Sequence, residues 1–417
     1  MSNIYFKSGL GLVAGLITTG FAAAQPMPAP SVGSTIPTEV HIDGGCLDPN
    51  KSVEQGKAIA CFDDFSWRSF IAMNWPAIVG QRGTADTAKS FGDVTVPTVW
   101  DTWKADYEVF QNRETPPPTG WTSFEATTPC PGVTDNSTKI LAAFSKFGGF
   151  NQAGFGVDFS PLVAQNKTYA RFEVRMNKAQ FDTIVNHEYY LASKLPDKDH
   201  PAVFNNNSIE LKAAWREIRD DELAAARSRY YIVPALVLDP VANSCSPKNM
   251  GLIGLHIVQK TPTFPQWIWS SFEHIDKFPI PSSTQRTNAA YRNAIANTVW
   301  ANYQLVITQW PLAPNQPSGN PFPNANNPSP VANSANAVME SYFQDIKPAP
   351  PSPAPATSCM GCHEFSRRRG GDFVWFMFLR AFEPPAAPAA APIAKPPGIT
   401  ARNEAIEDLK QLLKPAN

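Results

Sequence analysis

A short cysteine motif near the C-terminus constrains this chain more than any other part of its sequence. The five residues Cys359–His363 read C-M-G-C-H, so an imidazole directly follows the second of two closely spaced thiols. A structural zinc site needs a second pair of ligands nearby, and none follows in the sequence. A thioredoxin-like dithiol lies at a strand-to-helix turn, whereas this motif follows the proline-rich segment 348–355. The sequence context therefore favours neither a structural zinc site nor a thioredoxin-like dithiol.

The motif resembles the C-x-x-C-H motif of the c-type cytochromes, in which haem is bound covalently. The resemblance implies that Cys359 and Cys362 form thioether bonds to one haem c and that His363 is the proximal ligand of its iron. Arg367 and Arg368 follow closely and are candidates for hydrogen bonds to the haem propionates, although a solvated basic loop is the alternative. Small members of this family carry the motif near their start, so its place here predicts a different surrounding fold.

The N-terminus has the pattern of an exported protein. Lys7 is the only charged residue before a run of apolar and small residues, 9–24, which ends in a triple-alanine cleavage pattern. We expect a cleaved signal peptide over residues 1–24, with an uncleaved anchor as the alternative. No later segment offers the roughly 18 apolar residues of a membrane span. Motif and signal together predict a periplasmic protein.

The other four cysteines fit an oxidising compartment. An even number of thiols in an exported chain predicts two disulfides, for which three pairings exist. We favour Cys46–Cys61 with Cys130–Cys245, because the first two cysteines flank a short loop. The alternative is that some of them are free buried thiols.

Composition and periodicity predict an α+β fold with a central antiparallel sheet, surrounding helices, long Pro-rich loops and a helical C-terminal haem-attachment segment. The chain has 417 residues and 41 prolines, and its net charge of −1 gives no basic excess for nucleic acid. After the signal peptide we expect an extended lead-in, a large α+β domain, the haem-attachment segment packed on it, and an Ala/Pro linker with a terminal helix, at 25–60, 61–346, 347–383 and 384–417.

The spacing of apolar residues locates the elements. Helical spacing predicts helices at 67–75, 100–110, 178–191, 336–346 and 372–382, with Asp372 as the N-cap of the last. Alternation and apolar runs predict strands at 169–176, 230–238, 251–258, 266–275 and 301–310, while 208–215 is either a strand or a helix start. We expect the large domain and the helices 336–346 and 372–382 to enclose the haem.

The residue opposite His363 on the iron decides between electron transfer and ligand binding. His41, His187 and His200 lie in polar or amphipathic segments and are expected to be solvated. His256 and His274 lie in apolar strands, so we place one of them on the distal side, with a structural role as the alternative for each. His256 is expected to share a strand face with Leu252, Gly254 and Val258. Met339 and Met377 are further candidates, and Trp267 and Trp269 are expected to exclude water from the site.

Three functions follow from these features. The motif favours electron transfer with a periplasmic redox partner, which is the main prediction. The size of the chain favours an alternative, a haem oxidoreductase acting on a peroxide or a small organic substrate, because carrying one electron needs only a small domain. A haem-based binding or sensor protein is the third.

Overall fold

The structure is a computed structural model, and it describes the central part of the chain with gaps. The described residues are 29–41, 59–110, 118–123, 130, 139–141, 164, 166–239, 244–276, 284–310, 336, 338–339 and 359–381. The predicted signal peptide, the C-terminal linker and helix, most of the helix predicted at 336–346, and Cys46 lie outside these ranges.

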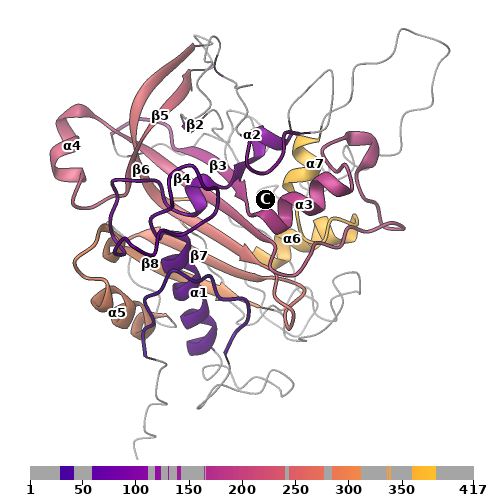
Figure 1. Cartoon of the computed structure of the whole chain (residues 1–417), viewed down its shortest axis with the longest axis horizontal. Coiled ribbons are helices and arrows are strands. Elements are labelled where there is room, and N and C mark those ends of the chain that lie inside the picture. The colour runs from indigo at the N-terminus through magenta and orange to yellow at the C-terminus, as the bar shows by residue number, and fades with distance from the viewer. Residues whose placement is uncertain are drawn as a thin grey trace, which may run out of the picture.

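A mixed sheet of eight strands forms the centre of the described structure (Figure 1). The strands are β1 (Lys104–Ala105), β2 (Lys139–Leu141), β3 (Arg171–Met176), β4 (Ile209–Ile218), β5 (Ile232–Asp239), β6 (Ser244–Gln259), β7 (Ile268–His274) and β8 (Tyr303–Gln309). Strand β6 is long enough to pair with β4 on one edge and with β5 and then β7 on the other, so the sheet branches there.

The predicted α+β class is confirmed, and the predicted antiparallel pairing holds for six of the seven strand pairs. The exception is β2, which pairs parallel with β5. These two strands are far apart in the sequence, so no tight hairpin forces them to be antiparallel.

Helices lie on both faces of the sheet. They are α1 (Ile59–Met73), α2 (Asp106–Val109), α3 (Lys178–Asn186), α4 (Asp220–Ala226), α5 (Gln285–Ala294), α6 (Cys359–Arg368) and α7 (Phe376–Arg380). Figure 1 shows α1 and α5 together on one side and α3, α6 and α7 together on the other. Apolar side chains from α3, α7 and β7 form one buried cluster with Met360 of α6, so the cysteine motif belongs to this second layer.

Helix α1 confirms the helix predicted from the aromatic residues that begin at Trp67. Trp67 and Phe70 are fully buried and pack against Phe272 of β7, with ring centroids 5.2 and 4.4 Å away. Burying aromatic side chains of this size provides a large share of the hydrophobic free energy of folding. Helix α1 ends at Met73, just before Pro76, as predicted.

Three predicted helices differ from the structure. The helix predicted at 178–191 ends at Asn186, because residues 187–190 form a turn in which Glu188 has φ +56°. Residues 100–110 form a short 3-10 turn, strand β1 and helix α2, because Trp103 is extended (ψ 163°) and the next two residues pair with β3. The helix predicted at 372–382 is only α7, and its N-cap is Trp375. The prediction that Asp372 caps this helix is wrong, because its carboxylate is bound by Lys260 and by the backbone N–H of Phe204.

Candidate haem-attachment site

The cysteine motif forms the start of helix α6. Cys359 is its first residue and is half-buried, while only the backbone of Cys362 is described. Residues three and four positions apart share one face of an α-helix, which is the spacing of positions 359, 362 and 363. The backbone N–H of Met360 donates to Oε1 of Gln309 at 3.2 Å, which joins the start of α6 to the end of β8.

The imidazole of His363 has a defined orientation. Its Nδ1 lies 2.6 Å from the carbonyl oxygen of Phe373, so Nδ1 carries the proton and donates it. The lone pair of the neutral ring is then on Nε2, which is the form in which histidine binds a metal ion. The indole ring of Trp269 packs against the imidazole, with ring centroids 4.4 Å apart.

A tight turn after α6 brings Phe373 back to His363. Gly370 has φ +89°, and a Cβ there would lie 2.0 Å from the carbonyl oxygen of Asp197. The carbonyl of Gly370 accepts from the N–H of Ala202 at 2.7 Å. Ser366 Oγ donates to the carbonyl of Val374 at 2.7 Å, which fastens the turn to the helix. The chain therefore folds back on α6 because glycine permits the close approach.

The face of the sheet toward α6 carries two rows of side chains across neighbouring strands. One row follows the register Val174, Lys212, His256 and Ser271. The adjacent row follows Met176, Glu210, Val258, Trp269 and Gln309. The second row contains Trp269 and Gln309, which contact α6. In the first row Val174, Lys212 and His256 are half-buried.

His256 lies on this face, close to the motif. It is the diagonal cross-strand neighbour of Trp269, because Trp269 faces Val258 directly, and such neighbours are about 7–8 Å apart. Val258 and Gly254 share its face as predicted, but Leu252 does not. A β-bulge at Ile253 turns Leu252 to the opposite face, where it joins the core under α1.

His274 lies on the opposite face. Its neighbours in β7, Ser270 and Phe272, contact α1, whereas Trp269 and Ser271 face the α6 side. The imidazole stacks on Tyr230 with ring centroids 4.0 Å apart, and its Nε2 lies 3.0 Å from the carbonyl oxygen of Arg229. Burial lowers the pKa of His274 to about 4. These contacts are those of a neutral structural histidine, the alternative that the sequence left open.

The other sequence candidates are distributed as follows. Met339 is fully buried against Gly254, on the face that carries His256, and Met377 is fully buried in the cluster around α7. Arg367 is half-buried and Arg368 is exposed, both in the last turn of α6. The side chains predicted to be solvated are exposed: His41, His187 and His200.

Glu210 and Lys212 are titratable residues on this sheet face that sequence reasoning did not name. Burial raises the pKa of the Glu210 carboxyl to about 7, although a hydrogen bond from Gln180 and the charge of Lys212 oppose the rise. Lys212 Nζ lies 5.1 Å from the centroid of the Phe172 ring. The signal that could have found them is the alternation along 208–215, which places the charged residues on one face of a strand.

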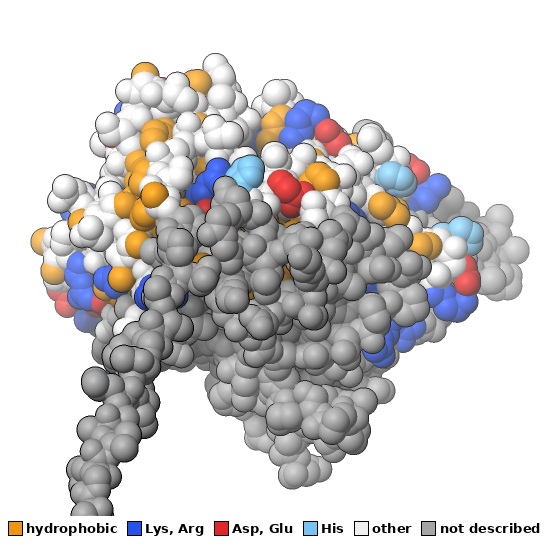
Figure 2. Space-filling model, turned by 90° about the horizontal axis from the view of Figure 1, so that it is seen from below, with side chains coloured by type: hydrophobic (Ala, Val, Ile, Leu, Met, Phe, Trp, Pro, Cys, Tyr) orange, Lys and Arg blue, Asp and Glu red, His pale blue; other side chains and the backbone are white. Residues whose placement is uncertain are grey.

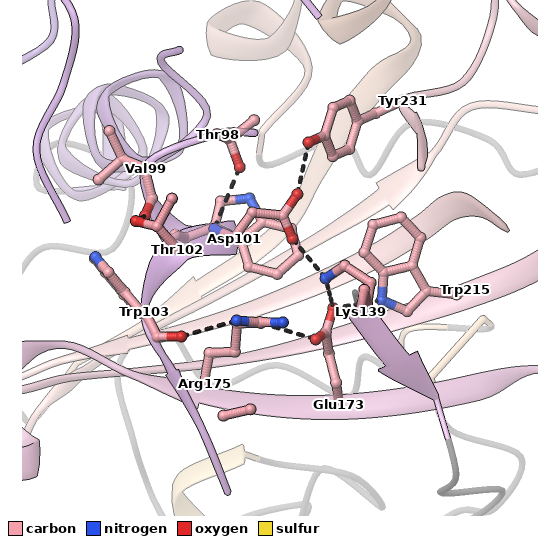
Figure 3. A network of polar contacts seen from close by, with 12 residues as sticks. Thr98, Val99, Asp101, Thr102, Trp103, Lys139, Glu173, Arg175, Trp215 and Tyr231 are labelled. Atoms are coloured by element: carbon pink, nitrogen blue, oxygen red, sulfur yellow. Dashed lines mark hydrogen bonds and ion pairs between the residues drawn. The ribbon is translucent and has the colours of Figure 1, made fainter. Parts of the chain in front are cut away.

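A second polar cluster is on the α1 side of the sheet (Figure 3). Lys139 lies between the rings of Trp100 and Trp215, at 5.1 and 4.8 Å, and forms ion pairs with Asp101 and Glu173 at 2.5 and 2.6 Å. Burial opposes ionisation of Glu173, but its cationic neighbours lower the pKa of its carboxyl overall. The charges satisfy one another, so we interpret the cluster as structural.

Cysteine pairing agrees with the prediction where it can be seen. Cys130 and Cys245 form a disulfide with Cα atoms 5.5 Å apart, which confirms that pair. Cys61 is also disulfide-bonded, and its predicted partner Cys46 lies outside the described residues.

Comparisons with known proteins give no relative: no family model, no curated protein and no solved structure matches the chain. Among the described residues, no group of three or more His, Cys, Asp or Glu side chains is arranged to hold a metal ion. In the same part of the chain, no helix has the length and apolar character needed to cross a membrane. On the face in Figure 2, the coloured surface carries Lys and Arg interspersed with Asp and Glu.

Proposed function

We propose that this protein is a c-type haem protein with one haem c, attached at Cys359 and Cys362, and with His363 as the proximal ligand of the iron. The observation that carries the proposal is the hydrogen bond from His363 Nδ1 to the carbonyl of Phe373, 2.6 Å long. It fixes the tautomer whose Nε2 lone pair can bind iron and strengthens that nitrogen as a donor. A bound haem supplies a one-electron couple at the iron.

The half-buried sheet face beside α6 supports a distal side formed by β4, β6 and β7. We favour His256 over His274 for this side, because His256 lies one diagonal step from Trp269 on the same face. Met339 is the alternative, since it packs against Gly254 two residues away. Arg367 and Arg368 remain our candidates for the propionates because they lie in α6 itself.

The main role that we propose is electron transfer to or from a periplasmic redox partner. The motif supports it directly, and the Cys130–Cys245 disulfide supports an oxidising compartment. In this role the sheet face excludes water from the iron, while Trp269 and Phe373 hold the proximal imidazole in place.

A haem-dependent oxidoreductase acting on a peroxide or a small organic molecule is the second candidate. The observation that favours it is the set of titratable side chains Glu210, Lys212 and His256 in the two rows beside the motif. A carboxyl with a pKa of about 7 can give up and take back a proton near neutral pH. A six-coordinate iron favours the first role, and an iron that binds carbon monoxide rapidly favours the second.

The test of haem binding is a pyridine haemochrome spectrum of protein produced with a haem c maturation system and then denatured. We expect a c-type spectrum from protein that keeps its haem in acid acetone. The Cys359→Ser and Cys362→Ser double variant should release haem, whereas Cys130→Ser should keep it. Haem that is extracted from the wild-type protein would refute the proposal.

A further inference from the structure

A buried ion pair holds the turn that follows α6. Nζ of Lys260 lies 2.6 Å from Oδ2 of Asp372, and the two side chains are 3% and 0% exposed. The same carboxylate accepts the backbone N–H of Phe204 at 2.8 Å and the indole N–H of Trp267 at 3.4 Å. Lys260 directly follows β6, and Trp267 directly precedes β7. The ion pair therefore joins the turn to the strands beneath the cysteine motif.

The anchored backbone has a conformation that its residues would not adopt alone. Asp372 has φ +46° and Phe373 has φ +66°, both in the left-handed region that side chains with a Cβ disfavour. Such residues persist only where the surrounding structure holds them, and they concentrate at functional sites. The groups that hold Asp372 are Lys260, Trp267 and the N–H of Phe204.

The strained residue Phe373 supplies the carbonyl that orients His363. Its oxygen accepts the Nδ1 proton at 2.6 Å. This carbonyl lies in the peptide unit between Phe373 and Val374, so the backbone angles of Phe373, the residue after Asp372, set its direction. A release of Asp372 would let residues 372 and 373 relax to ordinary φ values, which would turn this carbonyl away from the imidazole.

We propose that Lys260 and Asp372 are positioning residues for the proximal histidine: their ion pair fixes the Phe373 carbonyl, and through it the orientation and donor strength of His363. This inference rests on the proposed ligation of haem iron by His363. Lys260 binds Asp372, and Asp372 binds Phe204 and Trp267, so we let both residues act through the turn. A hydrogen bond to Nδ1 makes the imidazole a stronger donor, which favours the ferric over the ferrous iron.

The sign of the change in reduction potential separates positioning from simple electrostatics. Asp372→Asn removes a negative charge, and Lys260→Met removes a positive charge. If the pair acted only through its charges, the first variant would raise the potential and the second would lower it. If the pair positions His363, both variants weaken the Phe373 hydrogen bond, so both raise the potential.

The experiment measures the midpoint potential of the holoprotein by spectroelectrochemistry, after covalent haem has been verified in each variant. We expect both single variants to raise the potential by an amount equal to about a tenfold change in redox preference, or 59 mV for one electron. Asp101→Asn is the matched control, because it breaks the buried Asp101–Lys139 ion pair on the opposite face. It should leave the potential unchanged.

A combined Lys260→Met and Asp372→Asn variant covers the case in which a single variant fails to fold, since it leaves no unpaired buried charge. It should raise the potential as well. Shifts of opposite sign in the single variants, or a wild-type potential in the combined variant, would overturn the positioning role and leave the haem proposal standing. A wild-type protein without covalent haem would overturn the proposed function and this inference with it.

Discussion

The indole of Trp269 lies against the imidazole of His363, with ring centroids 4.4 Å apart and ring planes inclined by 57°. Trp269 belongs to strand β7, and His363 belongs to helix α6, so this contact joins the central sheet to the cysteine motif. Trp269 is 3% exposed and also contacts Phe373, whose carbonyl accepts the Nδ1 proton of His363. Two neighbours, one apolar and one polar, thus fix the orientation of a single imidazole.

Truncation of Trp269 should loosen this arrangement. Trp269→Ala removes a fully packed aromatic ring, so we expect a loss of about 3–5 kcal/mol in the free energy of unfolding, together with an altered ferric Soret band. Trp269→Phe keeps an aromatic contact, so its free energy of unfolding and its Soret band should be close to those of the wild type. Denaturant unfolding and absorption spectra measure the two effects. An unchanged Soret band in a folded Trp269→Ala protein would show that the ring does not support the haem ligand.

The two strand histidines provide a matched pair for the distal side. If His256 ligates the iron, the reduced wild-type protein should be low-spin and should bind carbon monoxide slowly, and His256→Ala should accelerate binding by at least about tenfold. His274 lies on the opposite face, so His274→Gln should not change the rate of carbon monoxide binding. Flash photolysis or stopped-flow mixing with carbon monoxide measures it. Equal rates for His256→Ala and the wild type would remove His256 from the distal side.

The strands and helix α1 could be predicted because their patterns are local. Arg171–Met176 alternates in polarity, and Trp67 and Phe70 repeat at helical spacing, so each segment indicates its own buried face. The prediction of a helix at 100–110 was wrong, although apolar residues recur at helical spacing there. There the pairing of Lys104 and Ala105 with β3 overrides local preference.

The site was harder to predict because its parts come from distant segments. Lys260 and Asp372 are 112 positions apart, and a buried aspartate before an apolar run has the same local pattern as a helix cap. The bulge at Ile253 changes the face of Leu252, and no single residue there indicates it. The motif itself needed no tertiary information, since its chemistry resides in five consecutive residues.

His274 should make the stability of the fold depend on pH. The pKa of this buried histidine is about 4, below the ordinary value of 6.5, so the unfolded chain takes up a proton first as the pH falls. The neutral imidazole therefore contributes about 3 kcal/mol to the free energy of unfolding. This contribution is complete above pH 6.5 and is lost as the pH falls from 6.5 to 4. Urea unfolding of His274→Gln should lack this component. An identical pH profile for both proteins would contradict the assignment.

The disulfide between Cys130 and Cys245 closes a long loop and should be a main determinant of stability. Cys130 and Cys245 are 115 positions apart, and removal of a native disulfide typically costs about 2–5 kcal/mol. The Cys130→Ala and Cys245→Ala double variant should therefore unfold at a lower denaturant concentration while it keeps covalent haem. An unchanged midpoint of unfolding would mean that the bridge does not constrain the unfolded chain as expected.

The most direct test of covalent haem attachment is peptide mass spectrometry of the holoprotein after denaturation and proteolysis without reduction. We expect the peptide containing Cys359–His363, and no other peptide, to carry the added mass of one haem and to absorb at the Soret wavelength. The same peptide without haem, or with Cys359 and Cys362 joined to each other as a disulfide, would contradict covalent attachment.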